Sequence, residues 1–179
     1  MIGLPTAQSY YKKFLLITGV GGFDIHLPKG YKKEVFQIEE HFLMQTNQST
    51  EAFIRKTGKN DSYVYNHEVR TFKDGQRITK KRQISGREYI ELMDQKAPGY
   101  KELKKFRQCF IYHNQHFMVE TMINADFQPT LLRFETSKES TKIEIPDFVS
   151  VLREVTTEEV YFTSSIAKLG WKMPDDDKK

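Results

Sequence analysis

The sequence predicts a mainly β, α+β fold: an antiparallel eight-stranded barrel with helices packed outside. At least eight segments alternate between apolar and polar residues, turn signals separate several of them, and few segments have a helical pattern. Many short alternating strands with few helices are typical of antiparallel barrels. Because 179 residues can bury one core, we expect a single domain over residues 1–179.

The first half of the chain predicts five strands. Residues 10–18 have a strand-like pattern, and the glycines and the proline within residues 19–30 indicate a long loop. Residues 33–44 alternate, with Phe36 and Phe42 on the apolar face. Three further strands are expected at 53–57, 63–72 and 76–84, with a hairpin turn at residues 74–75.

The second half of the chain predicts a helix, three further strands and a C-terminal part with both strand and helix patterns. Ser85 and Glu88 form a capping box, which starts a helix over residues 87–94. Strands are expected at 105–113, 116–123 and 131–136, a short strand or turn at 149–154, and a helix within 157–169. We expect the acidic tail, about residues 172–179, to fray.

Composition excludes several classes of protein. The single Cys109 excludes an internal disulfide and cysteine-rich zinc sites. No apolar run is long enough to cross a bilayer, and the first residues do not resemble a secretory signal, so we expect a cytoplasmic protein. The GVGG run, residues 19–22, lacks the Lys and hydroxyl of a P-loop, and no run of stacking aromatics predicts nucleic-acid binding.

The direction of the polar strand faces decides what the barrel contains. If these faces point inward, the interior is strongly basic and requires anions or acidic partners. If they point outward, the same Lys and Arg residues are ordinary solvated side chains. Alternation alone leaves both readings open.

The order of motifs resembles the triphosphate tunnel metalloenzymes, the CYTH superfamily. Their first strand reads roughly E-x-E-x-K-F-L, and here Ser9-x-Tyr11-x-Lys13-Phe14-Leu15 occupies that frame. The resemblance implies a tunnel barrel that binds phosphate through inward basic residues. Gln83 and Ser85 also stand where the family carries carboxylates. Ser, Tyr and Gln are poor magnesium ligands, so we expect no catalytic residue, no metal site, no cofactor and no enzymatic activity.

Several segments also resemble the carboxy-terminal domain of the TRPL translocation defect protein 14 family. They are FIRKTGKN, KKRQISGREYIELM, RQCFIYHNQHF, IPDF and LREVT. That resemblance implies a role in membrane trafficking and protein transport, with a phosphoinositide head group as the ligand. The family carries a P-loop GTPase domain that this chain lacks, so GTP would enter only through an upstream domain.

Together these observations predict a non-catalytic domain that binds a phosphorylated anionic ligand, with phosphoinositide lipid favoured and membrane contact peripheral. The alternatives are a metal-dependent triphosphatase or polyphosphatase, and a protein-interaction scaffold. The predicted phosphate-binding residues are Lys13, Arg55, Lys56, Arg70, Arg77, Lys81, Lys105, Arg107 and Arg153.

Overall fold

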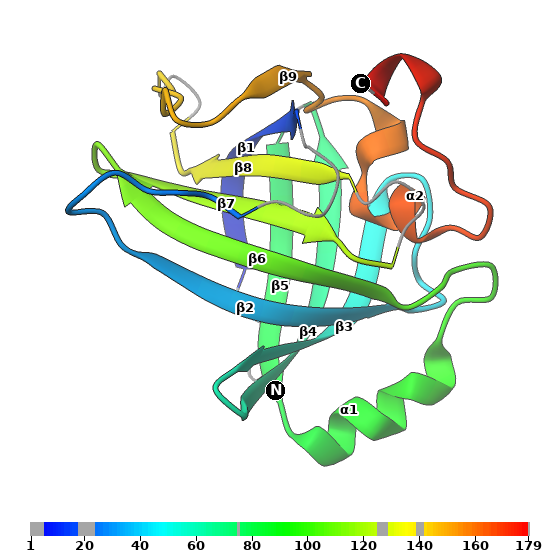
Figure 1. Cartoon of the computed structure of the whole chain (residues 1–179). Helices are drawn as coiled ribbons and strands as arrows, with labels where there is room; N and C mark the ends of the chain where they lie inside the picture. The colour runs from blue at the N-terminus through cyan, green and yellow to red at the C-terminus, as the bar shows by residue number, and fades with distance from the viewer. Residues whose placement is uncertain (1–5, 18–23, 75, 125–128, 139–141, 179) are drawn as a thin grey trace.

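Eight antiparallel strands close into a barrel, as the sequence predicts (Figure 1). The computed structural model describes residues 6–17, 24–74, 76–124, 129–138 and 142–178. The strands are β1 (Thr6–Leu16), β2 (Lys33–Phe42), β3 (Thr50–Lys59), β4 (Ser62–Lys73), β5 (Gln76–Ile84), β6 (Leu103–Tyr112), β7 (Gln115–Met122), β8 (Thr130–Thr136) and the short β9 (Val151–Glu154). The helical segments are α1 (Gly86–Leu92), η1 (Met93–Gln95), η2 (Glu159–Tyr161), α2 (Thr163–Ala167) and η3 (Asp175–Asp177).

Closure of the barrel depends on β1, which pairs with three strands. The sheet order is β5-β4-β3-β2-β6-β7-β8-β1-β9, and the first part of β1 also pairs with β5. The later part of β1 pairs with β8 on one side and with β9 on the other. The eight strands β1 to β8 therefore form the closed ring, and β9 is an addition outside it.

The alternation within the strands separates a charged interior from an apolar exterior. In β8, Arg133 points into the barrel, while Leu132 and Phe134 pack outside in an apolar cluster with Phe14 and Phe117. Successive side chains of a strand point to opposite faces. Because of this alternation, each strand presents apolar side chains to the surrounding loops and polar side chains to the barrel axis.

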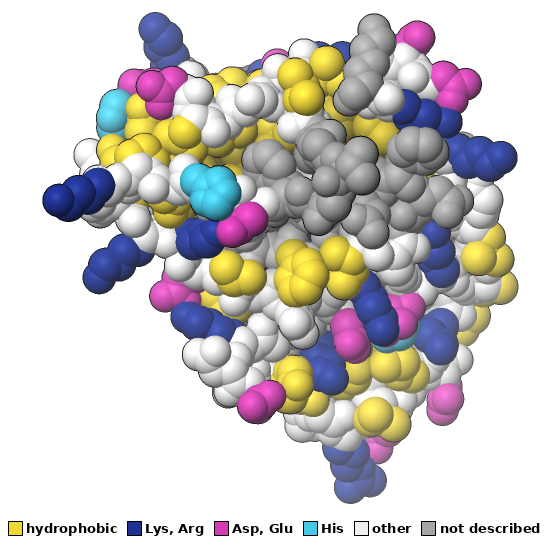
Figure 2. Space-filling view, viewed as in Figure 1, with side chains coloured by type: hydrophobic (Ala, Val, Ile, Leu, Met, Phe, Trp, Pro, Cys, Tyr) yellow, Lys and Arg dark blue, Asp and Glu magenta, His cyan; other side chains and the backbone are white. Residues whose placement is uncertain are grey.

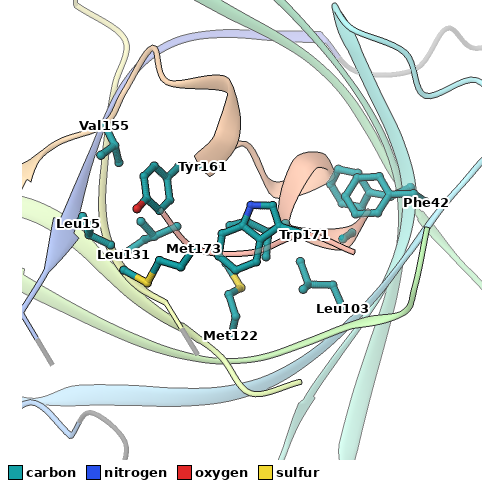
Figure 3. Close-up of a cluster of buried hydrophobic side chains, with 12 residues drawn as sticks. Leu15, Phe42, Leu103, Met122, Leu131, Val155, Tyr161, Trp171 and Met173 are labelled. Carbon is teal, nitrogen blue, oxygen red and sulfur yellow. The ribbon is translucent and has the colours of Figure 1, made fainter. Parts of the chain in front are cut away.

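One end of the barrel is closed by the C-terminal segment. Tyr161, Ile166 and Trp171 pack against inward apolar residues of the strands, among them Phe42 and Leu131 (Figure 3). Burial of one large apolar side chain contributes about 1.5–3 kcal/mol. This apolar plug leaves the charged part of the interior to the middle and the other end of the barrel.

Helix α1 packs outside the barrel, and its start follows the predicted capping box. The Ser85 hydroxyl accepts a hydrogen bond from the Glu88 backbone N–H at 3.1 Å. Tyr89 anchors the helix in an apolar cluster with Leu43 and Ile54. Among the described residues, no helix is long and apolar enough to cross a membrane.

The C-terminal region differs from the sequence prediction. The expected helix over 157–169 is only the short η2 and α2. The tail does not fray: Asp177 is buried and accepts hydrogen bonds from Arg153 and Tyr161. An acidic run is normally solvated, but here the partly exposed Arg153 pairs with the buried Asp177 carboxylate and holds it. The glycines of residues 19–22 and Gly75 of the predicted turn lie outside the described residues.

Candidate functional site

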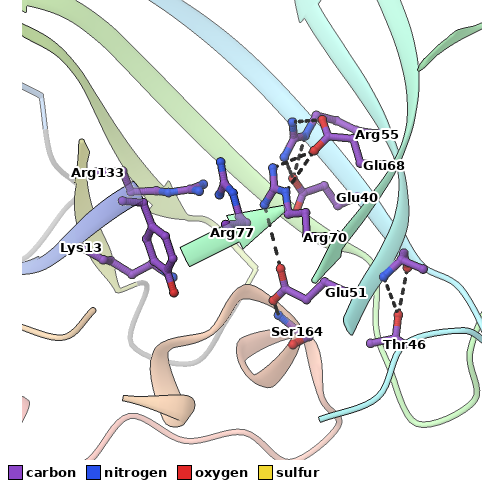
Figure 4. Close-up of polar contacts among 12 residues, drawn as sticks. Lys13, Glu40, Thr46, Glu51, Arg55, Glu68, Arg70, Arg77, Arg133 and Ser164 are labelled. Atoms are coloured by element: carbon purple, nitrogen blue, oxygen red, sulfur yellow. Dashed lines mark hydrogen bonds and ion pairs between the residues drawn. The ribbon is translucent and has the colours of Figure 1, made fainter. Parts of the chain in front are cut away.

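Charged side chains from all eight strands of the barrel meet in its interior. Figure 4 shows those of β1 to β5 and of β8. Among the described residues, the basic ones that point inward are Lys13, Arg55, Arg70, Arg77, Lys105, Arg107 and Arg133. The acidic ones are Glu40, Glu51, Glu68, Glu120 and Glu135. The described interior therefore carries more basic than acidic groups, which favours an anionic ligand.

One group of ion pairs links β2, β3 and β4. Arg55 lies 2.6 Å from Glu40 and 2.8 Å from Glu68, and Arg70 lies 2.8 Å from Glu68. Glu40 and Arg55 are direct neighbours across the β2–β3 pair. Burial alone raises the pKa of Glu40, but Lys105 and Arg55 outweigh it and lower this pKa to about 2. The carboxylate is therefore ionised and fully compensated at neutral pH.

A second group is centred on Glu120 of β7. Its carboxylate lies 2.8 Å from Lys105, 2.9 Å from Arg107 and 3.0 Å from Arg133. Arg133 also lies 3.4 Å from Glu135. One carboxylate facing three cations leaves positive charge that protein groups only partly neutralise.

The middle of the barrel holds cations that burial disfavours. Lys13 is buried and donates a hydrogen bond to the Tyr161 carbonyl oxygen at 3.0 Å. Burial, with a smaller contribution from Arg133, lowers the pKa of Lys13 to about 7. Burial, Arg70 and Arg133 lower the pKa of Arg77 to about 10.

Arg77 and Arg133 also retain unused hydrogen-bond donors. The Nε atom of each is buried and has no hydrogen-bond partner among the residues that the structure describes. A buried N–H group without an acceptor is costly. An anion in the middle of the barrel would supply acceptors near Arg77 and Arg133, whose side chains both extend into the interior in Figure 4.

A cavity of about 550 Å³ gives access to these charges at the end opposite the plug. Arg55, Lys81 and Arg107 line it, together with Asn66 and His116. Its volume falls within the range of roughly 300–1,000 Å³ that is usual for small-ligand sites. A phosphate chain entering here meets three basic side chains from β3, β5 and β6.

The structure brings together most of the predicted basic residues. Lys13, Arg55, Arg70, Arg77, Lys105 and Arg107 point into the barrel, and Lys81 lies at the mouth, 3.5 Å from Glu68. Two predictions of position are wrong. Lys56 follows Arg55 directly, so its side chain points outward, over the Tyr63 ring. Arg153 lies on β9 at the plugged end of the barrel, away from the other basic residues, where it pairs with Glu158 and Asp177 over the Tyr161 ring.

The sequence prediction missed Glu40, Glu51, Glu68 and Arg133. The resemblance to the tunnel enzymes led us to expect Glu120 and Glu135 inside as partners of Arg and Lys, and the structure places both there. Arg133 and Glu135 occupy alternate positions of β8, and Glu68 and Arg70 do so in β4. Every second residue of a strand points to the same face, so continuing this rule from the known inward residues along each strand would have identified the missed ones. The β1 positions of the tunnel-enzyme carboxylates differ: Tyr11 is buried, whereas the side chain of Ser9 lies outside the described residues. Ser85, compared above with another such position, caps α1 outside the barrel.

The face of the molecule in Figure 2 does not carry one extended basic patch among its described residues. Lys and Arg side chains stand there among acidic, hydrophobic and uncharged ones. On the exposed side of β5, Arg82 pairs with Glu88. Inside the barrel, by contrast, seven described basic side chains lie close together.

Comparison with known proteins shows the fold. No family model matches the sequence, and no curated protein matches it. The inorganic triphosphatase NE1496 superposes with a TM-score of 0.56 at 17% identity, covering 93% of this chain and 96% of that one. The chain has a tunnel fold of CYTH type. The PH1819 protein from Pyrococcus horikoshii OT3 gives a TM-score of 0.52 at 10% identity, covering 74% and 80%.

The comparison also contradicts one prediction. The loss of carboxylates at Ser9, Tyr11, Gln83 and Ser85 led us to expect a chain without enzymatic activity, yet the tunnel fold that it matches over 93% of its length is that of a triphosphatase. Missing carboxylates at these positions were too narrow a basis for that expectation, because catalysis of phosphoryl transfer depends on the charge of the whole site.

Proposed function

We propose that the chain is a tunnel-fold phosphohydrolase that binds the phosphate chain of tripolyphosphate or of a nucleoside triphosphate in its basic interior. The observation that carries this proposal is the excess of basic side chains inside the barrel, where a cavity lined by Arg55, Lys81 and Arg107 opens at one end. The inorganic triphosphatase NE1496 supports it as a protein of the same fold.

The type of basic residue favours phosphate over other anions. Arg55, Arg107 and Arg133 come from three strands, and a guanidinium group binds phosphate oxygens through two parallel hydrogen bonds. Phosphoryl transfer requires mainly positioning of the phosphate chain and stabilisation of the charge that spreads over its oxygens. A rigid set of arginines, held by cross-strand carboxylates, provides both.

Lys13 is the candidate for proton transfer. A group transfers protons best when its pKa lies near the working pH, and the pKa of Lys13 is about 7. The buried amine exchanges between charged and neutral forms at neutral pH. In its neutral form it can accept a proton from a water molecule that attacks the terminal phosphorus, and in its charged form it binds phosphate oxygen.

A phosphoinositide head group remains the alternative ligand, favoured by the resemblance to the trafficking family. Its phosphates would use the same guanidinium groups, so the ligand class has to be separated by experiment. The scaffold hypothesis also remains a prediction.

A pair of charge reversals on β5 tests the proposal. Lys81 and Lys80 are neighbours on one strand, but Lys81 lines the cavity and Lys80 points to the opposite face. Lys81→Glu should raise the Kd for tripolyphosphate at least about tenfold, because it places a like charge beside the phosphate. Lys80→Glu changes the net charge equally and should leave the Kd within about twofold of the parent.

The assays are isothermal titration calorimetry and release of phosphate from tripolyphosphate and ATP, with soluble inositol phosphate as a second ligand. We expect tripolyphosphate to bind more tightly and phosphate release to exceed the buffer rate. Equal losses in both variants would mean that only bulk charge is sensed. Tighter binding of inositol phosphate without hydrolysis would favour the lipid head group.

A further inference from the structure

Each interior carboxylate that the structure describes contacts at least one of the protein's own donors, and in Glu40 only the Oε1 atom does so, since its Oε2 atom has no hydrogen-bond partner among the described residues. Glu120 contacts Lys105, Arg107 and Arg133 at 2.8–3.0 Å. Glu40 contacts Arg55 at 2.6 Å and Lys105 at 3.1 Å. These contacts lower the pKa of Glu120 well below its ordinary value, although burial alone raises it. Its charge is therefore used to hold the basic groups in place.

The three remaining carboxylates are held in the same way. Glu68 pairs with Arg55 and Arg70, each at 2.8 Å. Glu135 pairs with Arg77 and with Arg133. Glu51 accepts a hydrogen bond at 2.9 Å from a backbone N–H group of α2, at Ser164, and lies 4.0 Å from Arg70.

The interior geometry does not fit the divalent metal ion that a tunnel metalloenzyme requires. Magnesium takes six oxygen ligands at about 2.0–2.1 Å in near-octahedral geometry. Among the described residues, the one group of three side chains spaced to hold a metal ion is Glu39, His41 and Glu102. Glu39 and His41 alternate with the inward Glu40 on β2, so this group lies on the outer face. A metal ion inside would have to displace arginines and lysines from the carboxylates.

We infer that the tunnel binds its phosphate chain without a divalent metal ion, with arginine and lysine supplying the positive charge. This inference rests on the proposed function, and it specifies which groups neutralise the negative charge of the phosphate chain in that site. The free Nε–H groups of Arg77 and Arg133 are donors available to phosphate oxygens without breaking an existing pair. In this arrangement the glutamates act as counter-ions that hold the guanidinium groups, and they compete with the phosphate for them.

Calorimetric titration of the full chain with tripolyphosphate, in EDTA and in excess magnesium, tests the inference. We expect binding in EDTA, with a Kd equal to or lower than that in magnesium, because magnesium reduces the charge of free tripolyphosphate. Binding only in magnesium, or at least tenfold tighter in magnesium, would overturn the inference and leave the proposed function standing. Lack of binding in both conditions would overturn the proposed function as well.

A second arm uses Glu135→Gln, with Glu91→Gln on the exposed face of α1 as the matched control. The side chain of Glu135 is 30% exposed, so its loss should not unfold the barrel. The two possible roles of Glu135, counter-ion or metal ligand, predict opposite changes in the affinity for tripolyphosphate when the carboxylate is removed. Removing a counter-ion frees Arg77 and Arg133, so we expect Glu135→Gln to bind tripolyphosphate in EDTA about three- to tenfold more tightly. Weaker binding by Glu135→Gln alone, with unchanged thermal unfolding, would contradict this role of Glu135.

Discussion

Replacing Arg107 by alanine removes a basic group from the cavity while leaving its ion-pair network closed. The side chain of Arg107 is 14% exposed and lies 2.9 Å from Glu120. After the substitution Glu120 retains Lys105 at 2.8 Å and Arg133 at 3.0 Å. Because no buried carboxylate is left without a partner, we expect the variant to fold.

The expected loss of affinity follows from the contact that is removed. A hydrogen bond to a charged group contributes about 1.5–3 kcal/mol, which corresponds to about a 10- to 150-fold change in Kd. Glu120 competes for the same guanidinium group, so we expect the lower end, about tenfold.

Titration calorimetry with tripolyphosphate in EDTA measures the change in Kd, and thermal unfolding monitors the fold. Arg87→Ala is the matched control, because the side chain of Arg87 lies on α1, is 89% exposed and pairs only with Glu91 among the described residues. If Arg107→Ala binds as tightly as Arg87→Ala while both remain folded, the cavity is not the phosphate site.

Two further predictions follow from the pKa values of buried groups. The affinity for tripolyphosphate should fall more steeply between pH 6 and 8 in the parent than in Lys13→Met, because only the parent loses the Lys13 charge near pH 7; equal slopes would refute this role. The folded-state pKa of Glu40, about 2, lies below the unfolded value of about 4.5, so its contribution is present above pH 4.5 and is lost as the pH falls through 2. That loss amounts to about 3 kcal/mol, and urea unfolding that is unchanged from pH 7 to pH 2.5 would contradict it.

Strand periodicity was sufficient to predict the barrel, but not the partners within it. The inward positions of Arg55 and Arg70 follow from alternation once the tunnel is assumed, and Lys56 fails by the same rule, because neighbouring residues of a strand point to opposite faces. The pairing of Arg77 with Glu135 joins β5 to β8. Such contacts depend on sheet order and register, which a single sequence does not contain.

The C-terminal region could not be predicted because its order depends on long-range contacts. Residues 175–177 are three aspartates, which favour solvent when considered alone. In the structure, Arg153 and Tyr161 hold Asp177 against the plugged end of the barrel. The local charge of the tail therefore predicted fraying. In the structure, the ion pair between Arg153 and Asp177, which are 24 residues apart in the sequence, holds the tail in place.

A crystal structure of the full chain with tripolyphosphate, grown in the presence of EDTA, tests the central claim most directly. We predict a phosphate chain inside the barrel, with oxygens within hydrogen-bond distance of Arg55, Lys81 and Arg107 at the cavity. A phosphate chain bound only on the outer surface of the barrel, with the interior ion pairs unchanged, would contradict the account.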